Sequence, residues 1–484
     1  MQDPQHDAIV VGSGPNGLAA ATVLAQAGLD VLVLEAANTA GGGTRCAELT
    51  LPGFLHDQCS GVHPMGVLSP FFRSLNLERY GLDWAFPKYS VAHPLDQEEA
   101  VLLGTSVEEC ADGLGEDAAA YTKLIGPFVD DAPSLFADLL APLRLPQDPL
   151  RMVRFGLRGF RSATGLAHAS FKGERARALL AGCAGHSVLP LEKLFTAAVG
   201  MVFLVSAHAT PWPVARGGSQ TIASALASAF RAAGGTIRTG TKVRSLKDLP
   251  RARAVLFDLA PRQVAQIAET NLPGGYLRRL GRYRYGPGVC KIDWALSGPI
   301  PWRDPRCSEA STVHVGGTIE EISASEAAAW NGTHSDRPYV IVCQQSHFDD
   351  RRAPRGSHTG YAYCHVPQGS TVDMRQIIES QIERFAPGFR DLILAHHTRT
   401  AVDHEVYNPS YVGGAITGGA ADWTQLFTRP VLRLNPYSTP NPGLFLCSQA
   451  TPPGGGVHGM CGYYAAQTVL RQRFGRRPQP LARA

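Results

Sequence analysis

The chain has 484 residues, of which 44% are hydrophobic and 18% charged, and its formal net charge is +4. That length favours two or three domains of about 100 to 200 residues each, and the composition excludes a wholly disordered or fibrous chain. Positive charges are scattered, so we expect no nucleic-acid partner. A basic C-terminal stretch leaves contact with an anionic membrane open, although a solvated terminus is the simpler interpretation; it holds Arg471, Arg473, Arg476, Arg477 and Arg483.

The ten cysteines form no CxxC pair and no Cys/His cluster at zinc spacing. The sequence therefore predicts reduced thiols, a cytoplasmic location and no metal site. The N-terminus lacks a basic segment followed by an apolar one, so no signal peptide is expected. The most apolar run, residues 195–209, is too short to cross a bilayer and predicts a buried helix or the wall of an apolar pocket.

The chain opens with a strand, a helix and a second strand. Residues 7–12 (DAIVVG) form a short apolar run, LAAATVLAQAG has a helical pattern, and residues 30–35 (DVLVLE) return to strand character. This is a βαβ unit, which predicts two parallel strands joined by a crossover helix.

The remaining elements alternate between helical and mixed segments. Residues 100–209 are mostly helical, and residues 217–233 predict a helix followed by strands in TIRTGTKVRSL and AVLFDLAP. Residues 289–296 and 339–345 predict strands of a second sheet. A buried strand at 443–447, a glycine-rich turn and a helix at 463–474 end the chain.

The first turn of the βαβ unit carries the motif GxGxxG, formed by Gly12, Ser13, Gly14, Pro15, Asn16 and Gly17. The first glycine allows the tight turn, the second lets the backbone approach a pyrophosphate, and the third lets helix and strand pack closely. The helix N-terminus then faces the anion. An ordinary glycine turn is the alternative, but its place between strand and helix predicts dinucleotide binding.

Glu35 ends the second strand, 18 positions after Gly17. An acidic side chain there accepts hydrogen bonds from a ribose diol and disfavours a 2′-phosphate, unless it is only a surface carboxylate. A second bare-backbone segment, Gly41 to Thr44, is followed by Arg45 and suggests another close approach to a long ligand, with a flexible loop as the alternative.

A further glycine turn lies near the C-terminus, where Gly454, Gly455 and Gly456 precede Val457 and His458. It also leads into a predicted helix, whose N-terminus suits a flavin pyrimidine that gathers negative charge on reduction. Glycine turns at opposite ends of one chain imply a dinucleotide that spans the fold.

Several stretches together resemble the phytoene-desaturase-like branch of the flavin amine oxidase superfamily: EAANTAGGGTR, PGFLHDQCSGVHP, ARGGSQTIASALA, GPGVCKIDWALSGPIPW and YSTPNPGLFLCSQATPPGGGVHGMCGYYAA. The resemblance covers nearly the whole chain and implies FAD. The residues it implies at the cofactor, together with their neighbours in the motifs, are Gly12, Ser13, Gly14, Pro15, Asn16, Gly17, Glu35, Ala36, Gly42, Gly43, Thr44, Arg45, Val243, Gly455, Gly456, Val457 and His458. Val243 would cover the adenine through its backbone. The polar middle, SASEAAAWNGTHSDRP, does not favour a carotenoid substrate.

Lys291 and His458 are the candidate catalytic residues. Lys291 lies in an apolar strand and resembles the lysine that many flavin amine oxidases place near flavin N5, where it holds a water or acts as a base. A lysine reaching solvent from a half-exposed strand is the alternative. His458 is the histidine best placed to contact flavin or substrate, whereas His56 and His63 are expected to make structural hydrogen bonds.

We therefore predict an α/β fold in which a Rossmann-type FAD-binding domain is interleaved with an α+β substrate domain, made of a mixed sheet and a helical insertion. The first comprises residues 1–95, 210–290 and 425–484, and the second comprises residues 96–209 and 291–424. No cysteine or histidine lies in a flavin-attachment pattern, so the FAD is expected to be non-covalent.

The predicted activity is dehydrogenation of a largely apolar small molecule by hydride transfer to flavin N5, with oxygen or a quinone as electron acceptor. The apolar segments 195–209 and 294–302 are expected to line its pocket. Three alternatives remain open: a flavin-dependent amine oxidase, a non-redox isomerase of the carotenoid type that uses reduced flavin, and a non-catalytic flavin-binding protein.

Overall fold

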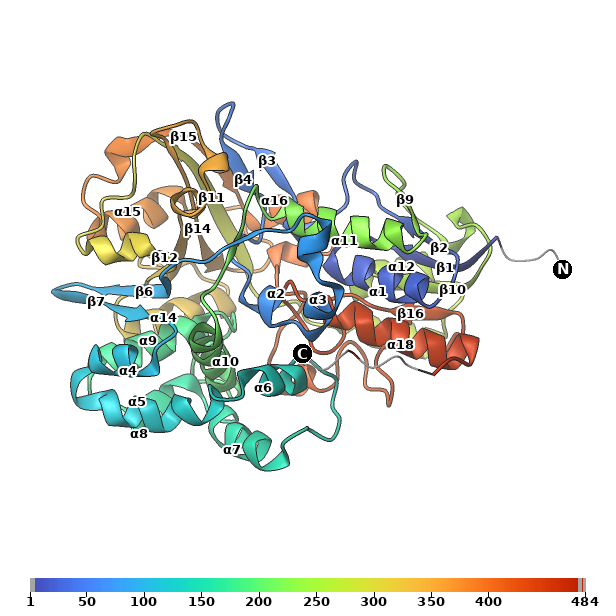
Figure 1. Ribbon diagram of the computed structural model, residues 1–484, viewed down its shortest axis with the longest axis horizontal. Coiled ribbons are helices and arrows are strands. Elements are labelled where there is room, and N and C mark those ends of the chain that lie inside the picture. The colour runs from blue at the N-terminus through green and yellow to red at the C-terminus, as the bar shows by residue number, and fades with distance from the viewer. Residues whose placement is uncertain (1–4, 478–480, 482–484) are drawn as a thin grey trace.

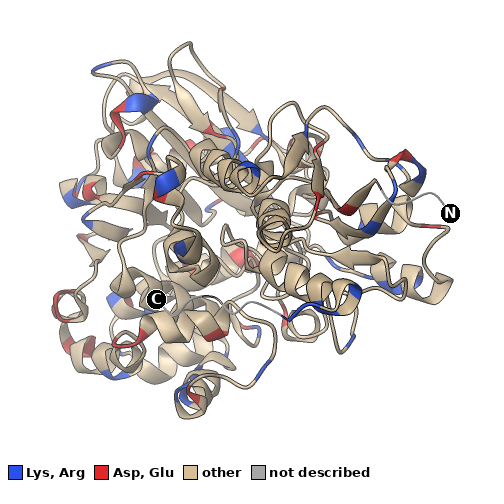
Figure 2. Ribbon diagram, turned by 45° about the vertical axis from the view of Figure 1, so that its right-hand side comes forward, with Lys and Arg blue, Asp and Glu red and all other residues tan. Residues whose placement is uncertain are grey.

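Two sheets lie side by side in the computed structural model, which describes residues 5–477 and residue 481 (Figure 1). Arg483 of the basic terminal stretch lies outside the described residues. Basic and acidic residues are intermixed over both lobes (Figure 2).

The first sheet has five strands in the order β16-β10-β1-β2-β9, and all its neighbours pair in parallel. It joins segments from both ends and the middle of the chain: β1 (His6–Val11), β2 (Val31–Leu34), β9 (Thr236–Arg238), β10 (Ala252–Phe257) and β16 (Leu444–Leu446). The predicted βαβ unit is formed by β1, α1 (Pro15–Gln26) and β2.

Helices cover both faces of this sheet, which is why its strands are apolar on both sides. Ala8, Val10 and Val33 belong to the core shared with α1, α11 (Gln220–Ala232) and α18 (Met460–Phe474). Ile9 and Leu32 face the opposite side, where α12 (Pro261–Ile267) and α13 (Gly274–Gly281) pack. The result is the three-layered, doubly wound arrangement expected of a Rossmann-type domain.

The second sheet is mixed and has seven strands in the order β15-β11-β14-β13-β12-β6-β7. Only β12 and β6 pair in parallel. Its strands are β6 (Tyr89–Leu95), β7 (Glu98–Leu103), β11 (Gly288–Leu296), β12 (Ala310–Val315), β13 (Val340–Cys343), β14 (His358–Val366) and β15 (Ile393–Arg399). Strands were predicted at two of these places, β11 and β13.

The two faces of this second sheet differ in chemistry. Cys290, Ile292 and Trp294 of β11 share a core with α15 (Arg375–Phe385) on one face. The opposite face is polar and aromatic, because Lys291 pairs in register with Tyr363, and Asp293 with Tyr361. That second face is turned toward the cavity described below.

The helical insertion predicted at residues 100–209 is present. It contains α4 (Val107–Asp112), α5 (Ala118–Ile125), α6 (Ala132–Leu139), α7 (Pro149–Gly159), α8 (Ala163–Ser170), α9 (Glu174–Gly185) and α10 (Thr196–Ala209). The apolar run at 195–209 is the buried helix α10. Within the described part of the chain, no helix has both the length and the apolar content needed to cross a bilayer.

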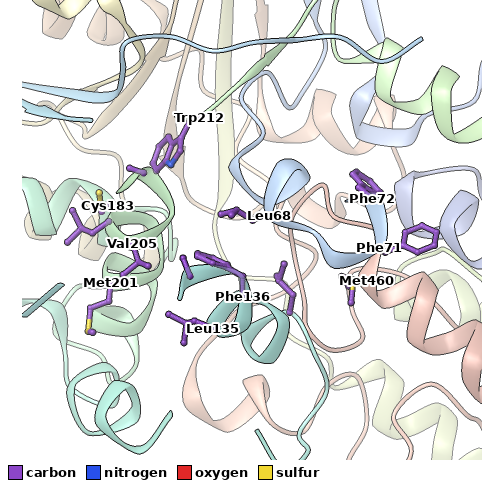
Figure 3. Packing of buried hydrophobic residues seen from close by; sticks show 14 of the residues in the cluster. Leu68, Phe71, Phe72, Leu135, Phe136, Cys183, Met201, Val205, Trp212 and Met460 are labelled. Atoms are coloured by element: carbon purple, nitrogen blue, oxygen red, sulfur yellow. The ribbon is translucent and has the colours of Figure 1, made fainter. Parts of the chain in front are cut away.

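Apolar packing joins this insertion to the Rossmann-type domain (Figure 3). One cluster contains Met201 and Val205 of α10, Phe136 of α6, Phe71 of α3 (Pro70–Leu75) and Met460 of α18. The two domains are therefore held together by a continuous core.

Three predicted boundaries differ from the structure. β6 falls inside the range 1–95 but pairs with β12, with Val91 opposite Thr312, so residues 89–95 belong to the second sheet. The boundary at 290 cuts through β11. Of the strand predicted over TIRTGTKVRSL, only β9 forms, because the edge position beside β2 offers partners to three residues and the rest becomes a loop. The α/β class and the interleaved two-domain architecture are confirmed.

Candidate functional site

A cavity of about 590 Å³ lies between the two sheets. One end is formed by the carboxyl ends of β1, β2 and β10, where ligands bind in open parallel sheets. The other end is formed by the polar and aromatic face of the second sheet and by the helical insertion. Fourteen of the predicted cofactor residues line it: Gly12, Ser13, Gly14, Pro15, Asn16, Glu35, Ala36, Gly42, Gly43, Thr44, Arg45, Val243, Gly456 and Val457.

The two N-terminal glycine segments lie against each other. Gly12 directly follows β1 and has φ of 100°, a backbone conformation that residues other than glycine rarely adopt. A Cβ on Gly42 would lie 3.0 Å from the Gly14 Cα, and the Gly41 N–H donates to the Ser13 carbonyl at 3.0 Å. Bare backbone therefore borders the cavity beside the N-terminus of α1, the usual setting for binding an anionic phosphate group.

Asp258 is a site residue that sequence analysis missed. It follows β10, lines the cavity, and accepts a hydrogen bond from the Gly17 N–H at 2.9 Å. Burial raises the pKa of its carboxyl to about 7, and the charge of Glu35 adds to the rise, while the N–H groups of Gly17 and Gly14 oppose it. An acidic residue directly after a strand of the parallel sheet was the available signal.

Gly17 does not line the cavity, but its position explains why it is glycine. A Cβ there would collide with the Gly12 carbonyl oxygen. A Cβ on Gly14 would lie 2.7 Å from the Asp258 Oδ2. Neighbouring protein atoms thus leave no room for a side chain at Gly14 or Gly17, while the backbone of the turn stays open toward the cavity.

Glu35 is held by the turn it faces. Its Oε2 accepts hydrogen bonds from the Ser13 N–H at 2.9 Å and the Ser13 hydroxyl at 2.5 Å, and its Oε1 accepts from the Ala37 N–H at 2.8 Å. The Thr241 N–H donates to the Glu35 carbonyl at 2.8 Å, which brings the loop of Val243 to the same end of the cavity. Glu35, Ala36 and Val243 therefore border one subsite.

Arg45 is anchored beside the second glycine segment. Its Nε donates to the Gly42 carbonyl at 3.0 Å, its Nη2 donates to the Tyr407 carbonyl at 3.1 Å, and its guanidinium lies 4.3 Å from the centroid of the Tyr407 ring. These contacts hold a positive charge at the wall of the cavity, where it can face an anionic or electron-rich ligand.

The C-terminal turn supplies the opposite wall just before α18. Gly456 has φ of 129° and, with Val457, borders the cavity. Gly455 does not line it and instead packs on the neighbouring loop, since a Cβ there would lie 2.7 Å from the Thr417 carbonyl oxygen.

His458 is not among the residues that line the cavity, and its predicted contact with flavin or substrate stays a prediction. Its side chain is fully buried beneath the turn, and its Nδ1 accepts a hydrogen bond from the Met460 N–H at 3.0 Å. Burial lowers its pKa to about 4. Because the chain turns at Gly459 to begin α18, the imidazole points into the core and caps the helix backbone.

Lys291 is likewise not among the residues that line the cavity. It is buried, pairs with the Asp293 carboxylate, and lies 4.3 Å from the centroid of the Tyr361 ring, which itself lines the cavity. Burial raises the pKa of the nearby Cys59 thiol, which lines the cavity, while a hydrogen bond with Tyr411 and the charge of Lys291 oppose that rise. In this structure Lys291 is a buried ion-pair partner next to a cavity-lining ring, and its catalytic role stays a prediction.

The expected structural histidines are hydrogen-bonded. His56 Nε2 lies 2.8 Å from the Thr50 hydroxyl oxygen, and His63 Nε2 lies 2.9 Å from the Ser219 hydroxyl oxygen. His63 also borders the cavity, and burial lowers its pKa to about 4. No group of three His, Cys, Asp or Glu residues in the described ranges is arranged to hold a metal ion.

The far end of the cavity is aromatic. It is lined by His186, Phe203, Trp212, Thr312, Ile341, Cys343, Tyr361 and Tyr363. The His186 ring stacks on Phe203 with centroids 4.3 Å apart, and its Nε2 lies 3.0 Å from the His314 Nε2. Burial lowers the pKa of His186 to about 3, so the imidazole is neutral at physiological pH.

The apolar segment 294–302 does not contribute to this pocket, although it was expected to. Trp294 and Trp302 are buried in the core on the opposite face of the second sheet. Side chains alternate between the faces of a strand, so Trp294 points away from the face that carries Lys291 and Asp293. His186, Tyr361 and Tyr363 were not predicted as site residues, because they come from segments far from the glycine motifs in sequence.

Taken together, this donor set fits a dinucleotide. Bare backbone at a helix N-terminus accommodates phosphates, Glu35 suits a ribose, and the cavity volume lies within the range of about 300 to 1,000 Å³ typical of ligand sites.

The fold and this site define a Rossmann-type dinucleotide-binding domain joined to a second, mixed-sheet domain. Residues 10–75 match the NAD(P)-binding Rossmann-like domain. The chain is 27% identical to pyridine nucleotide-disulfide oxidoreductase domain-containing protein 2 of Rattus norvegicus, over 97% of this chain and 94% of that protein. A stretch of 62 residues is 50% identical to the probable electron transfer flavoprotein-quinone oxidoreductase YdiS of Escherichia coli (strain K12), covering 11% of this chain and 14% of that protein.

Solved structures show the same fold. An oxidoreductase from Methanosarcina mazei has a TM-score of 0.65 at 16% identity and covers 96% of this chain and 100% of its own. A triple mutant of putrescine oxidase has a TM-score of 0.63 at 18% identity and covers 96% of this chain and 99% of its own. The fold implied by the family resemblance is confirmed, whereas membership of the phytoene-desaturase-like branch stays a prediction.

Proposed function

We propose that this chain is an oxidoreductase that binds FAD non-covalently and dehydrogenates an uncharged, mainly apolar small molecule. The observation that carries the proposal is that one cavity has two chemically different ends. Its Rossmann end has the glycine turns and Glu35, and its far end has aromatic and apolar walls.

FAD is the dinucleotide that this cavity suits best. Gly12 to Asn16 and Gly42 to Arg45 would hold the pyrophosphate, Glu35 and Val243 the adenosine, and Gly456 and Val457 the flavin ring. Bound flavin supplies an acceptor for hydride at N5. The names of YdiS, a probable electron transfer flavoprotein-quinone oxidoreductase, and of putrescine oxidase support an oxidoreductase.

The residues of the far end would bind and orient the substrate by shape. Phe203, Trp212 and Tyr363 would cover its apolar surface and exclude water, which strengthens every electrostatic interaction near the reacting bond. His186 is neutral there, so it offers a hydrogen-bonding nitrogen without a formal charge.

Charge is the observation that favours an uncharged substrate over an amine. The carboxylates that line the cavity within the described residues are Glu35 and Asp258, and both lie at the Rossmann end. A protonated amine at the far end would therefore lack an anionic partner, and burying an unpaired charge is costly. The amine oxidase alternative is correspondingly less favoured.

The proposed electron acceptor is oxygen or a quinone. Glu35 disfavours the 2′-phosphate of NADP, and the sequence contains no second complete GxGxxG βαβ unit for a nicotinamide cofactor. Electrons would then leave without a tightly held nicotinamide.

Anaerobic stopped-flow mixing tests the proposal. Apolar alkenes and terpenoids should bleach the flavin stoichiometrically, and matched primary amines should not. NADPH serves as the control. Rapid reduction by NADPH with none by the organic compounds would make the protein a reductase. Turnover by the pre-reduced protein without reoxidation of its flavin would identify an isomerase. Neither bleaching of the oxidised protein nor turnover by the reduced protein, with any compound, would favour a non-catalytic flavin-binding protein.

A further inference from the structure

Helix α7 presents apolar side chains outward. Leu150, Val153 and Leu157 follow a spacing of three and four residues, which places them on one face, and Phe160 continues that face. Leu150 and Leu157 are each 73% exposed, and Leu145 in the preceding loop is 92% exposed. A surface helix normally packs its apolar face against the protein core. An apolar face that stays exposed therefore indicates a binding surface.

The exposed apolar residues extend beyond this helix. The Phe160 ring lies 4.9 Å from Phe195, and Phe195 lies 5.3 Å from Phe427, measured between centroids. Phe160 and Phe427 are both exposed. We call this set the α7 surface; it consists of Leu143, Leu145, Leu150, Val153, Leu157, Phe160, Leu194 and Phe427.

Arginines accompany these apolar residues. Residues 143–161 contain five arginines and one acidic residue, Asp148. Asp148 caps α7 by accepting a hydrogen bond from the Arg151 N–H at 3.0 Å, and the buried Arg151 pairs with Asp131 at 2.6 Å. Arg154 and Arg161 are exposed beside the apolar face. The segment is thus both apolar and positively charged.

We infer that the α7 surface docks on the headgroup layer of a membrane that contains anionic lipid, with α7 lying in the plane of the interface. Exposed leucine and phenylalanine beside arginine is the composition of helices that lie at this boundary. Arginines near an anionic surface add attraction that salt weakens.

Charge disfavours a second copy of the chain as the occupant. In a two-fold dimer the same patch faces itself, so the arginines of one copy would meet those of the other. An anionic lipid layer offers complementary charge at the same place. Helix α7 lies at the outer edge of the helical insertion, away from the second sheet (Figure 1).

Helix α10 links the α7 surface to the cavity, which relates membrane docking to substrate binding. Helix α10 begins beside Phe195, in contact with the α7 surface, and its Phe203 lines the aromatic end of the cavity. One helix therefore connects the docking surface with the end of the cavity proposed to bind an apolar substrate. This last point rests on the proposed function, whereas the docking itself does not.

Co-sedimentation with vesicles tests the docking on the full-length protein as purified. We expect binding to phosphatidylcholine vesicles that contain phosphatidylglycerol, much weaker binding to phosphatidylcholine alone, and loss of binding as salt is raised. Leu150→Glu with Leu157→Glu should reduce the partition coefficient at least about tenfold, since two apolar side chains no longer enter the interface. Arg154→Gln with Arg161→Gln should weaken binding only where anionic lipid is present.

The matched control is Leu394→Glu, a change at a half-exposed leucine of β15 in the second sheet. It should leave vesicle binding unchanged. Melting temperature and bound flavin content should be equal in all variants, because every substituted side chain is exposed. Vesicle binding requires no flavin chemistry, so a failed activity assay leaves this result intact.

Equal vesicle binding by wild type and the Leu150→Glu, Leu157→Glu variant would overturn the inference, as would absence of binding to anionic vesicles. Light scattering after size exclusion adds a further outcome. A wild-type dimer that becomes monomeric in the same variant would show that a second copy covers this surface, and the membrane proposal would fall.

Discussion

Asp258 provides the sharpest test of how the dinucleotide site is built. Its carboxyl borders the cavity and accepts the Gly17 N–H, and its pKa is raised from 3.8 to about 7. Asp258→Asn preserves an acceptor oxygen of similar size while removing the ionisation. The variant therefore separates the titration of this group from its hydrogen bond.

The magnitude follows from the shift in pKa. A rise of about 3 units at 1.36 kcal/mol each corresponds to at most about 4 kcal/mol, and screening by solvent in the cavity lowers this figure. The folded-state pKa lies above the unfolded value, so the folded protein holds the proton more tightly. Stability is greatest below the unfolded pKa near 4 and is lost as the pH rises through about 7.

Urea unfolding of the ligand-free protein across that pH range measures the effect. The free energy of unfolding of wild type should decrease as the pH rises from about 4 to about 7. The decrease in Asp258→Asn should be smaller than in wild type, by up to about 4 kcal/mol. Glu269→Gln, at an exposed carboxylate of the same domain, is the control and should follow wild type. An identical pH dependence in wild type and Asp258→Asn would refute the assigned shift.

Three further predictions concern the cofactor and the second sheet. Gly14→Val should abolish flavin retention, because its Cβ would lie 2.7 Å from the Asp258 Oδ2, whereas Gly281→Val, with open space around it, should keep the flavin-to-protein absorbance ratio of wild type. Acid precipitation should leave the yellow colour in the supernatant, and colour in the pellet would contradict non-covalent binding. Lys291→Met should destabilise the protein by about 3 to 5 kcal/mol, because the buried Asp293 loses its cation, and adding Asp293→Asn should restore part of that loss. Unchanged stability with slower flavin reduction would instead return Lys291 to a catalytic role.

Local features of this protein could be predicted from sequence because their signals lie within a few residues. The βαβ unit, the turn at Gly12 to Gly17 and the buried helix α10 each depend on hydrophobic period and glycine placement along one short stretch. Their positions agree with the structure to within three residues. Residues of both predicted glycine turns border one cavity, whereas the ligand that would span them stays a prediction.

Features that depend on distant strands could not be predicted in this way. The parallel pairing of β6 with β12 joins residues more than 200 positions apart, and no local pattern at residues 89–95 reveals it. The same holds for Asp258, which meets Gly17 only because β10 lies beside β1.

The two predicted catalytic residues show most clearly what the sequence by itself determined and what the tertiary structure decided. Lys291 was correctly assigned to a strand, but only tertiary packing decides that its ammonium is buried against Asp293 and the Tyr361 ring. His458 was correctly assigned to the glycine turn, but the direction of the chain at Gly459 turns its ring into the core. Residue type and local conformation are encoded in neighbouring residues, whereas access to a cavity depends on which distant side chains lie in between.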